Sequence, residues 1–293
     1  MCYNRRVATF VLLHGSFHGG WCWGRVRPLL RAVGHEVFTP TLTGVGDRAH
    51  AATRETGLET HVLDIAQLLA FEDVRDVILV GHSYGCVLAT ALLHRIPERL
   101  GHVVYFDAGV PEDGQGAWDL FDEATRASIR RRMAEAGSDW LVPPPSPEAL
   151  GIVDPADVEW VAPRLTPMPL KAWTDPVRLG NPAAAGVPCS MIACGRGGAR
   201  AAQAARLRAI AMRRGWPFFE LDSGHDAMVT HPVELSAILL AIAERPGPVP
   251  ALQAIPLSNA AQHDPNLLGD DLRAVFESRL AHNRAAYDRL GDG

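Results

Sequence analysis

Runs of consecutive apolar residues alternate along this chain with segments in which apolar residues recur every three or four positions. The runs predict buried strands over residues 7–13, 36–39, 77–80, 102–106, 188–194 and 218–221. The periodic segments predict helices over residues 58–71, 87–96 and 199–213, one carrying Val26, Leu29 and Leu30, and one that starts near Pro232. Apolar strands that alternate with helices are typical of a mostly parallel sheet covered on both faces, so the pattern predicts an α/β fold.

This alternation stops between residues 111 and 186. The interval shows no strong strand and contains helical pieces at 117–136 and 155–162 between clusters of proline. We therefore predict a core built from residues 1–110 and 187–245, with residues 111–186 inserted as a helical lid. The lid contains five large aromatic side chains, which we expect to serve its own packing more often than substrate contact: Trp118, Phe121, Trp140, Trp160 and Trp173.

After residue 245 the chain leaves the α/β pattern. Residues 246–250 form a proline-rich linker, and residues 269–289 predict an amphipathic but highly charged helix. We interpret residues 246–293 as a C-terminal helical extension. Packing on the lid, contact in a homodimer and docking of a partner all remain open as its role.

Composition and charge exclude several classes of protein. The 293 residues are 47% hydrophobic and 21% charged, as in a soluble globular protein. A formal net charge of −5 without a basic run argues against nucleic-acid binding. No apolar run approaches the roughly 20 residues of a membrane helix, and the N-terminus lacks a signal-peptide pattern. Five cysteines without paired spacing indicate reduced thiols, so we expect a cytoplasmic protein with no membrane partner.

One short motif carries a specific chemical prediction. Gly81-His82-Ser83-Tyr84-Gly85 stands between an apolar strand and a helix and has the pattern G-x-S-x-G. In that context the motif forms a tight turn that exposes the serine hydroxyl at the carboxyl edge of the sheet. Flanking glycines are needed because side chains on either side of the turn would clash. The sequence therefore predicts that Ser83 is a nucleophile.

A serine nucleophile needs a base, and His225 is the histidine best placed to be one. It follows the last core strand in a Ser-Gly-His loop at the same edge of the sheet. His231 is the second choice, because its position beside Pro232 favours a role at a helix start. His94 and His102 lie away from the carboxyl edge.

The acid that orients the base presents a problem. The turn after residues 188–194, where the acid follows the lid in many proteins of this plan, contains no Asp or Glu. Asp107 ends the strand after the serine motif and can reach a histidine on the final loop, whereas Asp222 and Asp226 are too close in sequence to turn back on His225. We choose Asp107. A Ser-His dyad and an acid from the lid, Glu112 or Asp113, remain the alternatives.

Backbone N–H groups near Ser83 can stabilise a developing oxyanion. Tyr84 follows the nucleophile and supplies one N–H group, and Ser16 or, less favourably, Phe17 supplies the other from the glycine-rich loop after the first strand. His14 and His18 have the i, i+4 spacing of a metal pair, but the glycines around them predict a loop rather than the helix this spacing requires. We therefore expect no metal and no cofactor.

Together these segments resemble the α/β-hydrolase superfamily, and within it the small lidded serine esterases that include plant methylesterases, hydroxynitrile lyases and bacterial carboxylesterases. The matching pieces span residues 7–245: residues 14–23, 81–85, 104–108 and 215–228. The resemblance implies Ser83 as nucleophile, His225 as base, and Ser16 and Tyr84 as oxyanion donors. The empty acid position departs from the pattern. Certain lipases and discrete polyketide-release thioesterases carry the acid where Asp107 stands.

The sequence thus predicts a cofactor-free serine hydrolase. We expect it to cleave a carboxylic ester or thioester of a hydrophobic small molecule through an acyl-enzyme, with polyketide release or natural-product tailoring among its roles. The first alternative is a lyase, cyclase or acyltransferase of secondary metabolism on the same triad. The second is a non-catalytic ligand-binding protein on a hydrolase scaffold.

Overall fold

The computed structural model describes residues 7–195 and 197–244, so the predictions for residues 246–293 lie outside the described residues. Its centre is a sheet of six parallel strands. In spatial order they are β2 (Glu36–Phe38), β1 (Thr9–Leu13), β3 (Val77–His82), β4 (Leu100–Phe106), β7 (Cys189–Cys194) and β8 (Phe218–Leu221). The predicted α/β fold with a parallel sheet is confirmed.

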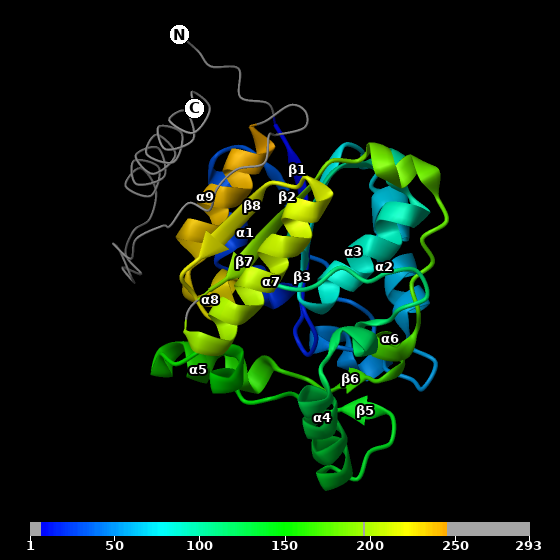
Figure 1. Cartoon of the computed structure of the whole chain (residues 1–293), viewed down its shortest axis with the longest axis vertical. Coiled ribbons are helices and arrows are strands. Elements are labelled where there is room, and N and C mark those ends of the chain that lie inside the picture. Colours follow the sequence, from blue (N-terminus) through cyan, green and yellow to red (C-terminus); the bar gives the residue numbers. More distant parts are fainter. Residues whose placement is uncertain (1–6, 196, 245–293) are drawn as a thin grey trace.

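Helices cover both faces of this sheet (Figure 1). One layer contains α2 (Leu58–Phe71), α3 (Tyr84–Arg95) and α7 (Gly198–Arg214); the other contains α1 (Val26–Ala32), α8 (Ala227–Thr230) and α9 (Pro232–Ala243). Successive side chains of a strand point to opposite faces, so Val11 joins the core of the first layer and Leu12 that of the second. Burial on both sides explains why these strands are apolar without alternation.

Residues between β4 and β7 form the inserted segment, which gathers at one end of the sheet in Figure 1. It contains α4 (Glu123–Glu135), α5 (Pro155–Val161), α6 (Lys171–Thr174) and a short antiparallel pair, β5 (Leu141–Val142) and β6 (Met168–Pro169). Short 3-10 turns connect them at Ala117–Leu120, Pro147–Leu150, Ala162–Arg164 and Pro182–Gly186. Two further 3-10 turns, Gly20–Trp23 and Gly46–Ala51, follow β1 and β2, and another, Pro97–Arg99, precedes β4.

The helix expected over residues 117–136 is divided in the structure. Its first residues form the 3-10 turn Ala117–Leu120, and the α-helix starts only at Glu123. Asp122 accepts a hydrogen bond from the Thr125 N–H at 2.8 Å, which satisfies one of the free donors of the first helical turn and fixes the start there. Among the described residues, no helix is both long and apolar enough to cross a membrane.

The turn between β3 and α3 is closely packed at its two glycines. A Cβ atom on Gly81 would lie 2.2 Å from the Gly85 carbonyl oxygen, and a Cβ atom on Gly85 would lie 3.0 Å from the Leu13 carbonyl oxygen. Both neighbours are backbone atoms that cannot rotate away. The glycines therefore allow strand, turn and helix to pack closely around Ser83.

We expect Gly81→Ala to lower the free energy of unfolding by about 1–3 kcal/mol, because the added methyl group must displace backbone. Gly180→Ala is the matched control, since a Cβ atom there has no neighbour within 4 Å. Urea unfolding followed by circular dichroism measures both. Equal stability of the two variants would contradict the close packing described here.

Candidate active site

Ser83 occupies the tight turn at the carboxyl end of β3 with a left-handed backbone, φ 54° and ψ −118°. A residue other than glycine is strained in this region, and such strain persists only where surrounding contacts hold it. Here the Ser83 N–H donates to the Phe106 carbonyl at 3.0 Å, and the Cys86 N–H donates to the Ser83 carbonyl at 2.9 Å. The side chain is half-buried, as expected for a hydroxyl presented at the edge of the sheet.

Asp107 and His225 are in direct contact, although 118 residues separate them. Asp107 follows β4 and is fully buried, and its Oδ2 lies 2.5 Å from Nδ1 of His225. Its other oxygen, Oδ1, accepts a hydrogen bond from the Cys194 N–H at 2.9 Å. The end of β7, which carries no acid, thus supplies a backbone donor that holds the acid of the neighbouring strand. With Nδ1 facing the carboxylate, Nε2 of His225 is the nitrogen left for a substrate proton.

His82 connects the serine turn with the histidine loop. Its Nε2–H donates to the His225 carbonyl at 3.0 Å, and the two imidazole rings pack with their centroids 4.6 Å apart. Burial lowers the pKa of His82 far below its usual range, with the nearby His225 acting in the same direction. A neutral His82 therefore holds the loop beside Ser83. No hydrogen bond joins Ser83 Oγ to His225 within the described part of the chain, and such bonds often form only with substrate bound.

The glycine-rich loop after β1 lies against Ser83. A Cβ atom on Gly15 would lie only 2.9 Å from Cβ of Ser83. The N–H groups of Ser16, Phe17 and Tyr84 have no acceptor among residues 7–195 and 197–244. Tyr84 begins α3, where the first N–H groups have no partner within the helix. These free N–H groups are geometrically available to bind a negative oxygen beside the serine.

The alternative residues lie elsewhere. His231 contacts the Thr230 hydroxyl at 2.8 Å at the start of α9. Glu112 and Asp113 are exposed, and Asp113 accepts a hydrogen bond from the Leu179 N–H. Asp226 faces His18, not the imidazole of the preceding residue. Of the acids considered from sequence, the structure brings Asp107 to His225.

Comparison with known proteins shows the family of the chain. The sequence matches the model of the "Alpha/beta hydrolase family" over residues 10–238. The chain belongs to the α/β-hydrolase family. It is 35% identical over 243 residues to the carbendazim hydrolyzing esterase of Nocardioides sp. (strain SG-4G), which covers 80% of this chain and all of that protein. It is 36% identical over 114 residues to methylesterase 1 of Arabidopsis thaliana, 38% of this chain and 43% of that protein. With esterases as relatives, this chain is an enzyme of the hydrolase type.

Solved structures share the fold. An extracellular α/β-hydrolase from a Paenibacillus species superimposes with a TM-score of 0.69 at 24% identity, covering 82% of this chain and all of that one. Tomato methylketone synthase I in complex with 2-tridecanone superimposes with a TM-score of 0.65 at 20% identity, covering 81% of this chain and 98% of that one. Both superpositions show that this chain shares their fold.

The inserted segment of this hydrolase reaches the glycine-rich loop through Trp173. The Trp173 indole N–H donates to the Ser16 hydroxyl at 2.9 Å, and its ring packs edge-on against Phe17 with centroids 5.6 Å apart. Phe121 packs on the other side of Trp173 at 5.1 Å. Trp173 therefore packs within the inserted segment and also holds the Ser16 side chain of the glycine-rich loop.

Histidines near the site are held by protein groups. His14 Nε2 accepts the Leu42 N–H at 3.1 Å and Nδ1 faces the Gly15 carbonyl at 2.8 Å, while burial lowers the pKa of His14 to about 3. Among the described residues, His82, His225 and Asp226 offer ligand atoms within 4.8 Å of one another. His82 Nε2 already bonds to the His225 carbonyl, and His225 Nδ1 already contacts Asp107.

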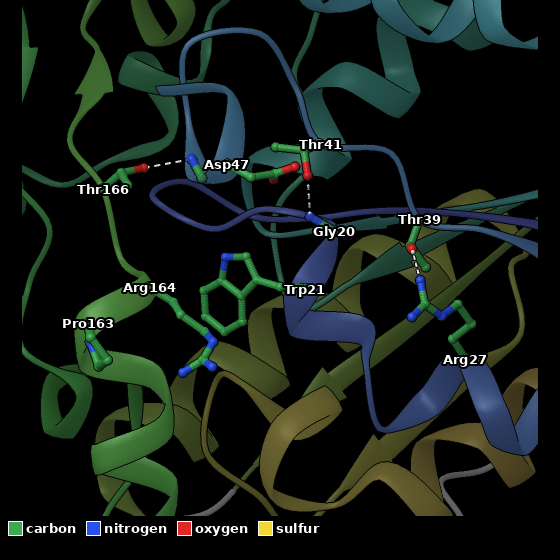
Figure 2. Close-up of a pocket in the computed structure, with 10 residues that line it drawn as sticks. Gly20, Trp21, Arg27, Thr39, Thr41, Asp47, Pro163, Arg164 and Thr166 are labelled. Atoms are coloured by element: carbon green, nitrogen blue, oxygen red, sulfur yellow. Dashed lines mark hydrogen bonds between the residues drawn. The ribbon is translucent and has the colours of Figure 1, made fainter. Parts of the chain in front are cut away.

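A cavity of about 500 Å³ lies on the outer side of the glycine-rich loop (Figure 2). It is lined by Trp21, Thr41, Asp47, Arg164 and Thr166 among others, and by neither Ser83 nor His225. In Figure 2 the Trp21 indole separates Arg164 from the loop above it. This cavity is therefore distinct from the space directly over the serine.

Arg200 is a contact that the sequence analysis missed. From α7 its Nη1 lies 3.1 Å from Oδ2 of Asp107 and 3.2 Å from Nδ1 of His225. Gln203, one turn further, donates to the Asp107 carbonyl at 3.2 Å. The segment after β7 contains no acid, and the one sequence signal for this contact was the presence of Arg200 in that segment. The guanidinium is thus a second charged partner of the buried Asp107 carboxylate, beside His225.

We expect Arg200→Gln to lower the free energy of unfolding by about 1–3 kcal/mol, because the buried Asp107 carboxylate loses one of its hydrogen-bond donors. Arg208→Gln is the control, since Arg208 lies on the same helix but pairs with the partly exposed Glu220 at 2.6 Å. Urea unfolding followed by circular dichroism measures both. An equal loss of stability in the two variants would contradict a specific role of Arg200 beside Asp107.

Proposed function

We propose that this hydrolase is a serine esterase in which Ser83 is the nucleophile, His225 the general base and Asp107 the acid that orients it. The N–H groups of Ser16 and Tyr84 serve as oxyanion donors. The observation that carries this proposal is the contact of a fully buried carboxylate with the imidazole beside a strained turn that carries a half-buried serine. Free N–H groups next to that serine support it.

The reaction follows from the positions of these groups. The Ser83 oxygen attacks the ester carbonyl carbon while its proton passes to Nε2 of His225, and the carbonyl oxygen becomes an anion that the two N–H groups stabilise. His225 then gives the proton to the alkoxide that leaves, which forms an acyl-enzyme and a free alcohol. Water attacks this acyl-enzyme by the same route in reverse and releases the acid. Asp107 stabilises the imidazolium in both steps.

For the substrate we propose a small apolar ester. One relative is an esterase named for hydrolysis of carbendazim, and several shorter matches are to proteins named methylesterase. Phe17, Phe121 and Trp173 form an aromatic cluster beside the glycine-rich loop, which favours a hydrophobic acyl group. A thioester would follow the same acyl-enzyme route. Because discrete polyketide-release thioesterases carry their acid at the position of Asp107, a polyketide thioester is the thioester substrate that we propose.

A second candidate keeps the site but not hydrolysis. The chain is 34% identical over 110 residues, 37% of its length, to norfluorocurarine synthase 1 of Strychnos, a relative whose name is not that of a hydrolase. A lyase, cyclase or acyltransferase reaction would use His225 as the base, with or without an acyl group on Ser83. Analysis of the product distinguishes the two, because only hydrolysis releases the free acid.

We expect Ser83→Ala to abolish turnover of p-nitrophenyl acetate and labelling by a fluorophosphonate probe. Asp107→Asn should lower kcat by about 10³- to 10⁴-fold with a small change in KM, because the imidazole loses its orienting charge. Rates and probe labelling of folded protein, checked by circular dichroism, measure both variants.

Asp139→Asn is a suitable control, since Asp139 is exposed and pairs with Arg54 on the surface. Full activity in Asp107→Asn would move the acid to another residue or leave a dyad. A wild-type protein that is folded but neither labelled nor active would favour the non-catalytic ligand-binding alternative.

A further inference from the structure

His18 and Asp226 form a buried ion pair behind the site. Nε2 of His18 lies 2.9 Å from Oδ2 of Asp226, and both side chains are almost completely inaccessible, with 2% and 0% exposed. They are 208 residues apart in the chain, and neither takes part in the mechanism described above. A buried charged pair weakens a fold less than an unpaired charge but seldom adds stability over apolar packing, so its function needs another explanation.

The second nitrogen of His18 holds the glycine-rich loop. Nδ1 lies 2.7 Å from the Ser16 carbonyl oxygen. Because the peptide group is planar and trans, fixing this carbonyl also fixes the direction of the Phe17 N–H and the orientation of the loop that carries the Ser16 N–H. Phe17 itself has a left-handed backbone, φ 70°, which a neighbouring contact must maintain. The loop therefore depends on His18 for its conformation.

Both ring nitrogens of His18 face oxygen acceptors, a carbonyl and a carboxylate. Each must carry a hydrogen to bond, so the geometry requires the imidazolium form. Burial opposes that charge, but the charge of Asp226 and the hydrogen bonds to Asp226 and Ser16 outweigh it and raise the pKa of His18. The reciprocal attraction overcomes the effect of burial on the carboxyl group and lowers the pKa of Asp226 to about 2.

The groups around this pair come from four elements. His14 at the end of β1, His82 at the end of β3 and His225 in the last loop add charge only when protonated, and the Cys22 thiol has its pKa raised by burial. The Trp21 ring stacks on His18 at 5.3 Å with an angle of 28°, and Trp21 also lines the cavity of Figure 2. No described group therefore replaces Asp226 as the counter-charge of His18.

Asp226 is the residue directly after His225. We infer that His18 and Asp226 are positioning residues that link the glycine-rich loop to the histidine loop and so fix the distance between the oxyanion donors and the base. The inference rests on the function proposed above. The pair connects the C-terminal side of β1 to the C-terminal side of β8, two strands that are not neighbours in the sheet. Without it, only the neighbouring elements would set the spacing of the two loops.

The test uses the full chain and p-nitrophenyl acetate as substrate. We expect His18→Gln and Asp226→Asn each to lower kcat about 100-fold with KM changed less than threefold, because loops displaced by a fraction of an ångström bind the transition state less well. The double variant should be no slower than either single one, since both remove one interaction. Asp226→Glu should recover part of the loss by restoring the charge.

The pH profile of kcat separates positioning from mere structure. The positive charge of His18 is present below its raised pKa and is lost as pH rises through that value. In Asp226→Asn burial acts without a counter-charge, so the alkaline limb should move to lower pH by about one unit or more. Asp157→Asn is the matched control: Asp157 is 3% exposed and pairs with Arg25 at 2.6 Å, and its loss should affect stability but not the alkaline limb.

The possible results distinguish failure of this inference from failure of the proposed function. Variants with kcat and a pH profile equal to wild type overturn the inference, as does an Asp226→Asn variant that matches Asp157→Asn in every measurement. If Ser83→Ala keeps the activity of wild type, the proposed function fails instead, and the loop linkage must then be judged from His18 imidazole NMR signals alone. Those signals should show two ring N–H protons in wild type at pH 7, and one N–H proton there would also overturn the inference.

Discussion

The buried carboxylate of Asp107 holds together the segments that meet at the carboxyl edge of this sheet. An ionised Asp107 without partners would destabilise the fold by several kcal/mol. It is satisfied by the Cys194 N–H from β7, by Arg200 from α7 and by His225 from the loop after β8. The Cys194 N–H and His225 belong to β7 and to the loop after β8, which follow β4 in the sheet in the order β4, β7 and β8, and Arg200 belongs to the helix between those two strands. The observed sheet order brings these partners to Asp107, and the same contacts hold the His225 imidazole in position.

Three residues with strained backbone lie in the same region. Phe17, Ser83 and Asp107 all have positive φ angles, and each follows one of three adjacent strands, β1, β3 and β4. Such conformations are unfavourable by about 1–3 kcal/mol each and are kept only where the surroundings determine them. The surroundings here are the apolar cores on both sides of the sheet and the hydrogen bonds to Phe106 and Ile192. The rigid layers hold the strained residues beside one another.

The sequence allowed prediction of the strands, the serine turn and the contact partner of His225. Each depended on local signals: uninterrupted apolar runs, glycines flanking a serine, and an acid at the end of a strand that had to neighbour the histidine loop. Asp107 could be chosen because parallel strands bring their carboxyl ends to one edge. Asp226 was excluded as the orienting acid, and it does face His18 instead of His225. Its partner His18 was not predicted from the sequence.

The contacts that could not be predicted all join distant segments. His18 meets Asp226 across 208 residues, and Trp173 meets Ser16 across 157. Neither histidine spacing nor tryptophan content indicates such partners, because they depend on how the inserted segment and the last loop pack on the core. Arg200 is visible in the sequence, but its contact with Asp107 is not. That contact depends on how α7 is rotated about its axis when it packs on the sheet.

The pairing of β4 with β7 also determines the geometry of the acid. Asp107 extends from one of these neighbouring strands, and the other ends in the backbone group that holds it. The two strand ends therefore act together on one imidazole, β4 through a side chain and β7 through the N–H group that orients that side chain. A slip in the register of these two strands would separate the carboxylate from its donor while leaving both residues in the sequence unchanged.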